Sequence, residues 1–157
     1  MYHTHISQEK NLIPRCTLPK RIEECTEDEL KNIAVRNKPI DAGFWTSTSN
    51  DPKSSVWADV FNPDKAKYIH SYDVVGSPDV LDIGNESKRN RIFEEFVYED
   101  TNVIDWRRIA LNFDAVRVYD DGIPPKSEIG KPFGFWQLKS TLWFNVEYLK
   151  YNSTLKL

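Results

Sequence analysis

The chain has 157 residues, enough for one domain with a single core, and we expect residues 1–157 to form one domain. The net charge of -3 argues against a nucleic-acid binder that relies on bulk charge. No apolar stretch is long enough to span a bilayer, so we expect no membrane partner. Aromatic residues make up 13% of the chain, more than a small core holds, which predicts rings at a surface or in a pocket.

The cysteines and histidines point to no metal site. Cys16 and Cys25 stand nine apart without a CxxC pattern, and the N-terminus does not resemble a signal peptide. We therefore expect a cytoplasmic protein with two reduced cysteines. His3 and His5 share the face of a predicted strand, but two ligands are too few for a metal ion.

The first half of the chain predicts strands that alternate with short helices. A strand is expected over residues 1–6, followed by an irregular connection that holds two prolines. Thr26 and Glu29 form a capping box that opens a helix to about residue 35. A strand is predicted over residues 43–48, and Asp51-Pro52 predicts the start of a helix that ends before Asn62-Pro63.

The second half continues the alternation. Strands are predicted over residues 67–75, 80–83 and 115–119. Asn85 is expected to cap a helix, and residues 103–112 predict another. Residues 121–135 form a long Gly/Pro-rich loop of the kind that is often functional. The pattern as a whole predicts an α+β fold with a mixed sheet and flanking helices.

The last predicted strand, residues 140–151, contains one carboxylate that its pattern does not require. Glu147 lies between Val146 and Tyr148 in a run of β-branched and aromatic residues. A charge in such a run is costly unless it is exposed or has a partner. Glu147 is therefore a candidate catalytic residue, and a solvent-facing glutamate on an edge strand is the alternative.

A second candidate segment is the run of hydroxyl residues after Gly43-Phe44-Trp45. In an extended chain, residues 46–49 place hydroxyls on both faces, and a buried hydroxyl needs a partner. Glu147 is one candidate partner. The register stays open, because residues 46–48 and 47–49 match the pattern equally and Ser47 is common to both. A polar strand end leading into a turn is the alternative.

Taken together with Tyr2-His3-Thr4, these segments resemble the ADP-ribosyltransferase superfamily, over nearly the whole chain and in the family's order. In that family a first-strand Arg or His meets NAD, a second strand carries an aromatic residue followed by Ser-Thr-Ser, and a late strand carries the catalytic Glu. The resemblance implies a split mixed sheet, NAD as co-substrate and a mono-ADP-ribosyltransferase that acts as a toxin, an effector or a housekeeping enzyme.

The resemblance also implies roles for individual residues. Glu147 would stabilise charge on the ribose, Ser47 would orient it, and Asn145 would influence the acceptor. NAD would be bound by residues from the first two strands: His3, Thr4, Phe44, Trp45 and Thr48. The loop that contains Phe133, Phe135 and Trp136 would present aromatic surface to the acceptor, unless its rings pack underneath it.

The chain departs from the family in three places, one of which is the hydroxyl run, where the His-bearing branch usually has a Tyr. The first strand has no Arg, and Asn145 replaces the Gln or Glu of the arginine-modifying branch. The acceptor, a protein, a nucleic acid, a small molecule or water, therefore stays open. Two other functions also stay open: a non-catalytic interaction module on the same fold, and an RNA-modifying enzyme with a local basic patch. The candidate residues for that patch are Arg89, Arg91, Arg107 and Arg108.

Overall fold

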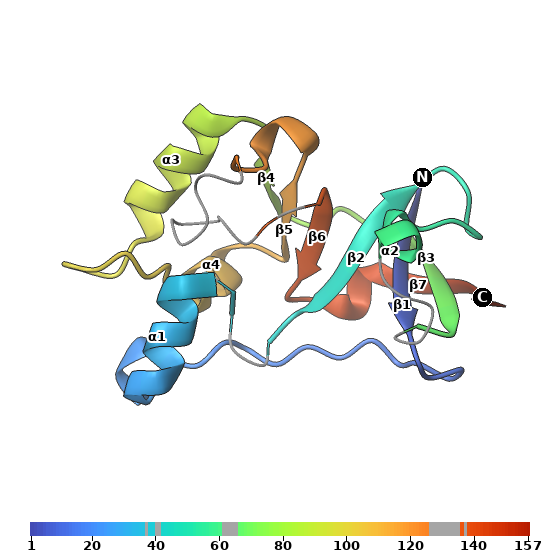
Figure 1. The fold of residues 1–157 in the computed structure, drawn as a ribbon, viewed down its shortest axis with the longest axis horizontal. Helices are drawn as coiled ribbons and strands as arrows, with labels where there is room; N and C mark the ends of the chain where they lie inside the picture. The colour runs from blue at the N-terminus through green and yellow to red at the C-terminus, as the bar shows by residue number, and fades with distance from the viewer. Residues whose placement is uncertain (37, 40–41, 61–65, 126–135, 137) are drawn as a thin grey trace.

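One seven-stranded mixed sheet organises the computed structural model, which describes residues 1–36, 38–39, 42–60, 66–125, 136 and 138–157 (Figure 1). The strands are β1 (Tyr2–Ser7), β2 (Phe44–Ser49), β3 (Tyr68–Val74), β4 (Val80–Ile83), β5 (Ala115–Val118), β6 (Ser140–Trp143) and β7 (Leu149–Lys156). Their order across the sheet is β4-β5-β6-β2-β1-β3-β7. The α+β class and the mixed sheet are thus confirmed.

Strand β2 joins two halves of different character. The first half contains β1, β3 and β7, and the second contains β4, β5 and β6. All pairs are antiparallel except β4 and β5, which are parallel. Gly43 precedes β2 with φ 85°, and a Cβ at this position would collide with the side chain of Leu142. A glycine is therefore required where β2 begins beside β6.

Helices begin where local capping signals place them. Helix α1 (Glu27–Arg36) opens on the predicted box, in which Glu29 accepts from the Thr26 amide and Thr26 Oγ1 accepts from the Glu29 amide. Asn85 caps α3 (Glu86–Phe96) by accepting from the Lys88 amide. Both predictions from the capping pattern are confirmed. Helix α4 (Trp106–Asn112) is shorter than predicted, because Asp105 caps it after an extended segment.

Helix α2 (Val56–Val60) starts later than predicted. Asp51 instead closes a turn by accepting from the Lys53 amide, and the helix begins after Ser55, whose Oγ accepts from the Trp57 amide. Ser55 is 2% exposed. Besides capping the helix, its hydroxyl contacts Ser47 of β2 and so joins the helix to the sheet. The prediction of an Asp51 cap was wrong because two competing side-chain caps lie within five residues.

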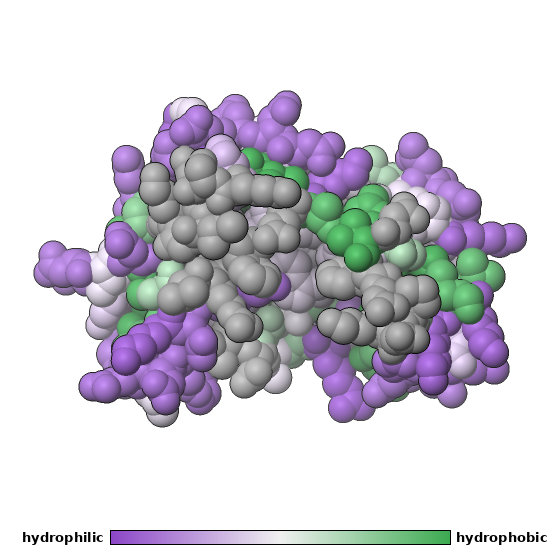
Figure 2. Space-filling model, viewed as in Figure 1, coloured by the Kyte–Doolittle hydropathy of each residue, from purple (hydrophilic) through white to green (hydrophobic). Residues whose placement is uncertain are grey.

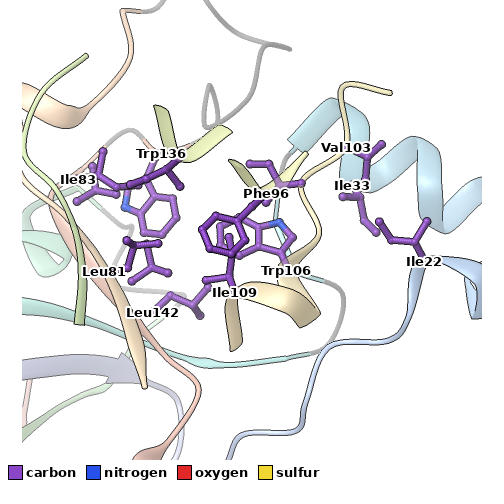
Figure 3. Packing of buried hydrophobic residues seen from close by; sticks show 14 residues of the cluster. Ile22, Ile33, Leu81, Ile83, Phe96, Val103, Trp106, Ile109, Trp136 and Leu142 are labelled. Atoms are coloured by element: carbon purple, nitrogen blue, oxygen red, sulfur yellow. The ribbon is translucent and has the colours of Figure 1, made fainter. Parts of the chain in front are cut away.

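The main core lies between the second half of the sheet and helices α1, α3 and α4. Leu81, Ile83 and Leu142 point from the sheet toward α3 and α4, where they meet Phe96, Trp106 and Ile109 (Figure 3). Alternation along the strands sends their polar neighbours to the opposite face. Helices α1 and α3 present hydrophilic surface to the viewer (Figure 2). Because of this alternation, the polar side chains of the second half of the sheet gather on the face that is turned away from the helices.

The predicted strand over residues 140–151 was wrong. Strand β6 ends at Trp143, a 3-10 turn covers Val146–Tyr148, and β7 begins at Leu149. The two strands belong to opposite halves of the sheet, since β6 pairs with β2 and β5 whereas β7 pairs with β3. The chain must leave the sheet between them, and Asn145 closes the turn by accepting from the Glu147 amide.

Candidate functional site

The two segments predicted to bind NAD are neighbours in the sheet. His3 pairs with Thr48 and Thr4 pairs with Ser47 across β1 and β2. Successive side chains in a strand point to opposite faces. His3 and Thr4 therefore serve different faces, which we call the His3 face and the Ser47 face.

The Ser47 face is closed and fully hydrogen-bonded. Ser47 Oγ lies 2.9 Å from Thr4 Oγ1 and 3.1 Å from Ser55 Oγ, and Thr4 and Ser47 are both 0% exposed. The Ser55 hydroxyl in turn accepts from the Trp57 amide. Among the described residues, the predicted bond between Ser47 and Glu147 is absent. The Ser47 hydroxyl instead fastens α2 to the first two strands.

The His3 face carries a chain of polar contacts that starts at Trp143. Trp143 Nε1–H donates to Thr46 Oγ1 over 2.9 Å, and the same oxygen lies 2.9 Å from His3 Nδ1. His3 and Trp143 also meet edge to face, with ring centroids 5.2 Å apart. Burial, and next the charge of Arg117, lower the pKa of His3 to about 4. His3 is therefore neutral near pH 7.

Phe44 and Trp45 line a cavity of about 480 Å³, which we call the Phe44 cavity. His5 stacks on Phe44 with ring centroids 4.5 Å apart, and its Nδ1 lies 2.7 Å from the Trp45 carbonyl oxygen. The cavity is completed by Gly43 and by residues from the connection after β1: Glu9, Asn11, Leu12, Ile13 and Arg15. It thus joins two predicted NAD-binding residues to a segment that was not predicted to contribute.

His5 and Arg15 are the residues that sequence reasoning missed. Burial lowers the pKa of His5, against the opposing effect of the Trp45 carbonyl, so the imidazole is neutral at neutral pH. Its spacing of two from His3 was the available signal, because it places both rings on one side of β1. No local pattern distinguished Arg15 from other exposed cations.

Glu147 is exposed in the 3-10 turn, and among the described residues no hydrogen bond or ion pair reaches its carboxylate. Its neighbours Val146 and Tyr148 pack against the cluster around Phe44, to which Leu12 also belongs. Because Phe44 and Leu12 line the Phe44 cavity, the turn and the cavity share one hydrophobic cluster. Asn145 is engaged on both sides, since its Nδ2 donates to Asp114 Oδ1 while its Oδ1 caps the turn.

The remaining predicted residues are placed as follows. Thr48 is half-buried opposite His3. Trp136 is 5% exposed and packs into the main core beside Trp45 and Trp106, while Phe133 and Phe135 lie outside the described residues. The candidate basic patch of four arginines lacks Arg89, which is buried and donates to the Gly122 carbonyl.

Arg107 and Arg108 are likewise engaged with backbone carbonyls, those of Pro19 and Glu95. In the described part of the chain, no three His, Cys, Asp or Glu side chains are grouped to hold a metal ion. Within the same residues, every helix is too short or too polar to cross a membrane. Comparison with protein-family models, curated proteins and solved structures gives no match.

Proposed function

We propose that the protein cleaves NAD at the bond between nicotinamide and ribose and transfers ADP-ribose to an acceptor. The single observation that carries the proposal is the hydrophobic cluster around Phe44. It connects the aromatic wall of the Phe44 cavity to the two residues that flank Glu147. One hydrophobic cluster therefore joins two of the three segments that resemble the ADP-ribosyltransferase family.

The chemistry of the cavity suits a dinucleotide. Half-buried His5, whose ring stacks on Phe44, offers a neutral aromatic surface for a flat nicotinamide, and its second ring nitrogen offers a hydrogen bond. Arg15 is exposed at the wall and supplies a guanidinium for the pyrophosphate. Apolar walls with a few polar groups are the usual composition of a cofactor pocket.

In the proposed reaction the bond between ribose C1′ and the nicotinamide nitrogen breaks, and its electron pair neutralises the pyridinium. Positive charge develops on the ribose, as in glycoside hydrolysis. The Glu147 carboxylate stabilises that charge from the turn. The acceptor then forms a bond to C1′ and releases its proton to solvent. His3 lies in a different cavity, so His5 takes the place at the NAD site that the sequence suggested for His3.

The test is the Glu147→Gln variant, which keeps the size of the side chain and removes its charge. We expect nicotinamide release from NAD, followed by chromatography, to fall by about 10²–10³-fold. Glu94→Gln, on the exposed side of α3, is the matched control and should leave the rate unchanged. Equal rates for the wild type and Glu147→Gln would contradict the assignment.

A companion variant, Asn145→Ala, tests the acceptor role that the sequence suggested. The Asn145 amide holds the Glu147 backbone, so its loss should reduce NAD hydrolysis and ADP-ribose transfer by the same factor. A change in transfer alone, with hydrolysis spared, would return Asn145 to the acceptor side. Both rates are measured on one sample with labelled NAD.

A second candidate function is a non-catalytic binding module on the same fold. It is favoured by the exposure of Glu147, because catalytic carboxylates are usually held in place by their surroundings. It is also favoured by the late strand β6, which pairs with β2. The family resemblance calls for a catalytic Glu on a late strand, but β6 covers Ser140–Trp143 and carries no carboxylate. Calorimetric binding of NAD without any nicotinamide release would establish this function and exclude the transferase.

A further inference from the structure

A second cavity, of about 420 Å³, opens on the His3 face, and none of the described residues lines both this cavity and the Phe44 cavity. We call it the Thr141 cavity. It is lined by one residue of β1, five residues of β4–β6 and the end of β3 with the connection that follows: His3, Val80, Asp82, Arg117, Thr141, Trp143, Val74, Pro78 and Asp79. None of these residues serves in the proposed transferase mechanism.

The floor of the cavity is a row of polar side chains that crosses four strands. Asp82 is paired with Arg117, Arg117 with Thr141, and Thr141 with Thr46, so all four share one face of the sheet. Thr46 then meets His3 Nδ1. The apolar core lies on the other face of β4, β5 and β6, so its packing does not require this polar row.

The protonation of His3 follows from the partners of Thr46. Thr46 Oγ1 accepts the indole proton of Trp143, which can only donate, and Thr46 is 0% exposed. If Thr46 also accepted from His3, its own hydroxyl proton would be buried without an acceptor among the described partners. Thr46 therefore donates to His3 Nδ1, and the His3 proton sits on Nε2. Because no described partner takes this Nε2–H, it is available as a donor to the cavity.

Thr141 provides an independent sign of an absent ligand. The residue is 1% exposed, and its hydroxyl has no hydrogen-bond partner among the residues that the structure describes. A buried hydroxyl without a partner destabilises the folded state, so most are paired. Thr141 lines the cavity between Arg117 and Thr46, where a bound molecule would supply the missing partner.

Arg117 and Asp82 add both hydrogen-bond donors and acceptors. Arg117 Nε lies 2.8 Å from Asp82 Oδ1, and Nη2 lies 3.1 Å from Oδ2. This bidentate pair leaves N–H groups of Arg117 and lone pairs of Asp82 unused. Asp79 places a second carboxyl group in the wall.

We propose that the Thr141 cavity binds a neutral polyhydroxylated molecule of the pentose class, either as a free sugar or as part of a nucleoside. Sugar hydroxyls donate to the carboxylates of Asp79 and Asp82 and accept from Arg117, His3 and Thr141. Carboxylates bind vicinal ribose hydroxyls in dinucleotide sites in the same manner. The assignment does not depend on NAD cleavage.

Two other ligand classes fit less well. A free anion would meet two carboxylates and a single guanidinium that is already paired, with His3 neutral. A flat heterocycle would need a ring face to stack on, but Trp143, the aromatic residue with the largest ring in the lining, is 1% exposed. A small molecule that both donates and accepts at every position satisfies the mixed lining best.

The experiment follows the indole N–H resonance of Trp143 by NMR, because this proton reports on the chain through Thr46 to His3. D-ribose should shift it in a saturable manner, while 2-deoxy-D-ribose should bind at least about tenfold more weakly because a buried polar group loses its partner. The deoxy sugar also controls for the general effect of added sugar on the protein. Adenosine distinguishes a nucleoside from a free sugar.

Two variants decide the assignment. Asp82→Asn and Thr141→Val should each weaken ribose binding by at least about tenfold. Asp28→Asn, on the exposed side of α1, and Glu147→Gln should bind ribose like the wild type. The latter result separates this site from the proposed transferase. Should Asp82→Asn fail to fold, Thr141→Val decides, since it preserves shape.

Three results would overturn the proposal: no saturable shift with either ribose or adenosine, unchanged ribose affinity in both variants, or tighter binding of inorganic phosphate than of ribose. The last result would identify Arg117 as an anion site. Each of these outcomes is visible in the same resonance.

Discussion

The two faces of the β1–β2 pair carry similar polar side chains, but these side chains have different roles on each face. On the Ser47 face, three hydroxyls bond to one another and to a helix amide, and every partner is supplied by the protein. On the His3 face, the chain from Trp143 through Thr46 to His3 ends at a cavity, and Thr141 beside it lacks a partner. A row of hydroxyls in a sequence therefore does not indicate a site; the unsatisfied group does.

The largest effect on stability should come from Thr46→Val, which breaks the polar chain of the His3 face. The change leaves Trp143 Nε1–H and His3 Nδ1 buried without their partner. Each orphaned group costs about 1–3 kcal/mol, so we expect a loss of roughly 4 kcal/mol in the free energy of unfolding. Urea denaturation measures it. Thr48→Val, two residues along the strand and half-buried, is the matched control and should change stability by less than about 1 kcal/mol.

The next effect is a pH dependence that belongs to His3. Its pKa is lowered to about 4 in the folded state, so between pH 6.5 and 4 the unfolded chain binds more protons than the folded one. The contribution of His3 to the free energy of unfolding amounts to about 3 kcal/mol. It is fully present above pH 6.5 and is lost as the pH falls toward 4. His5 and His70 act in the same direction, because burial lowers both pKa values.

The difference between the wild type and His3→Gln isolates the His3 contribution. Between pH 7 and pH 4.5, the free energy of unfolding should fall less in the variant than in the wild type. Parallel pH profiles would mean that His3 is not buried as a neutral group, and the two faces would then differ less than we infer.

A smaller effect is expected from Ser47→Ala on the closed face. The variant loses two hydroxyl contacts, but Thr4 and Ser55 remain and the cavity created is small. We expect a loss of about 1–2 kcal/mol in urea denaturation, with ribose binding unchanged. Ser87→Ala, exposed on α3, is the control. Weaker ribose binding in Ser47→Ala would show that the two faces are coupled.

The smallest effect has the opposite sign. Thr141→Val removes a buried hydroxyl that has no partner, so the free protein should gain about 1 kcal/mol in unfolding free energy. The same substitution is expected to weaken ribose binding, so stability and binding move in opposite directions. A destabilised Thr141→Val protein would indicate that the hydroxyl already has a partner in solution.

Much of the fold was predictable because its signals are local. The capping box of Thr26 and Glu29 and the cap at Asn85 placed two helices, and strand β4 matches the predicted residues 80–83. The strand assigned to residues 140–151 failed because Val-Glu-Tyr alternates like a strand while Asn145 closes a turn. Side-chain alternation cannot detect that turn.

The candidate site was less predictable, because its contacts join residues that are distant in the chain. Sequence reasoning found Phe44 and Trp45 at a cavity wall and His3 beside the hydroxyl strand. It could not find the row of Asp82, Arg117 and Thr141, which depends on the register of three separate strands. It also placed Ser47 and His3 at one dinucleotide. Their side chains lie on opposite faces of the sheet, because Ser47 pairs with Thr4, the residue next to His3 on β1.

The position of β7 has a consequence for how the molecule assembles. This strand comes last in the chain and completes the half of the sheet that β1 begins, by pairing along the full length of β3. During synthesis, β3 therefore has one unpaired edge until β7 has been made. Such distant pairing slows folding, so the nascent chain is exposed to wrong partners for longer than one whose neighbours follow in order.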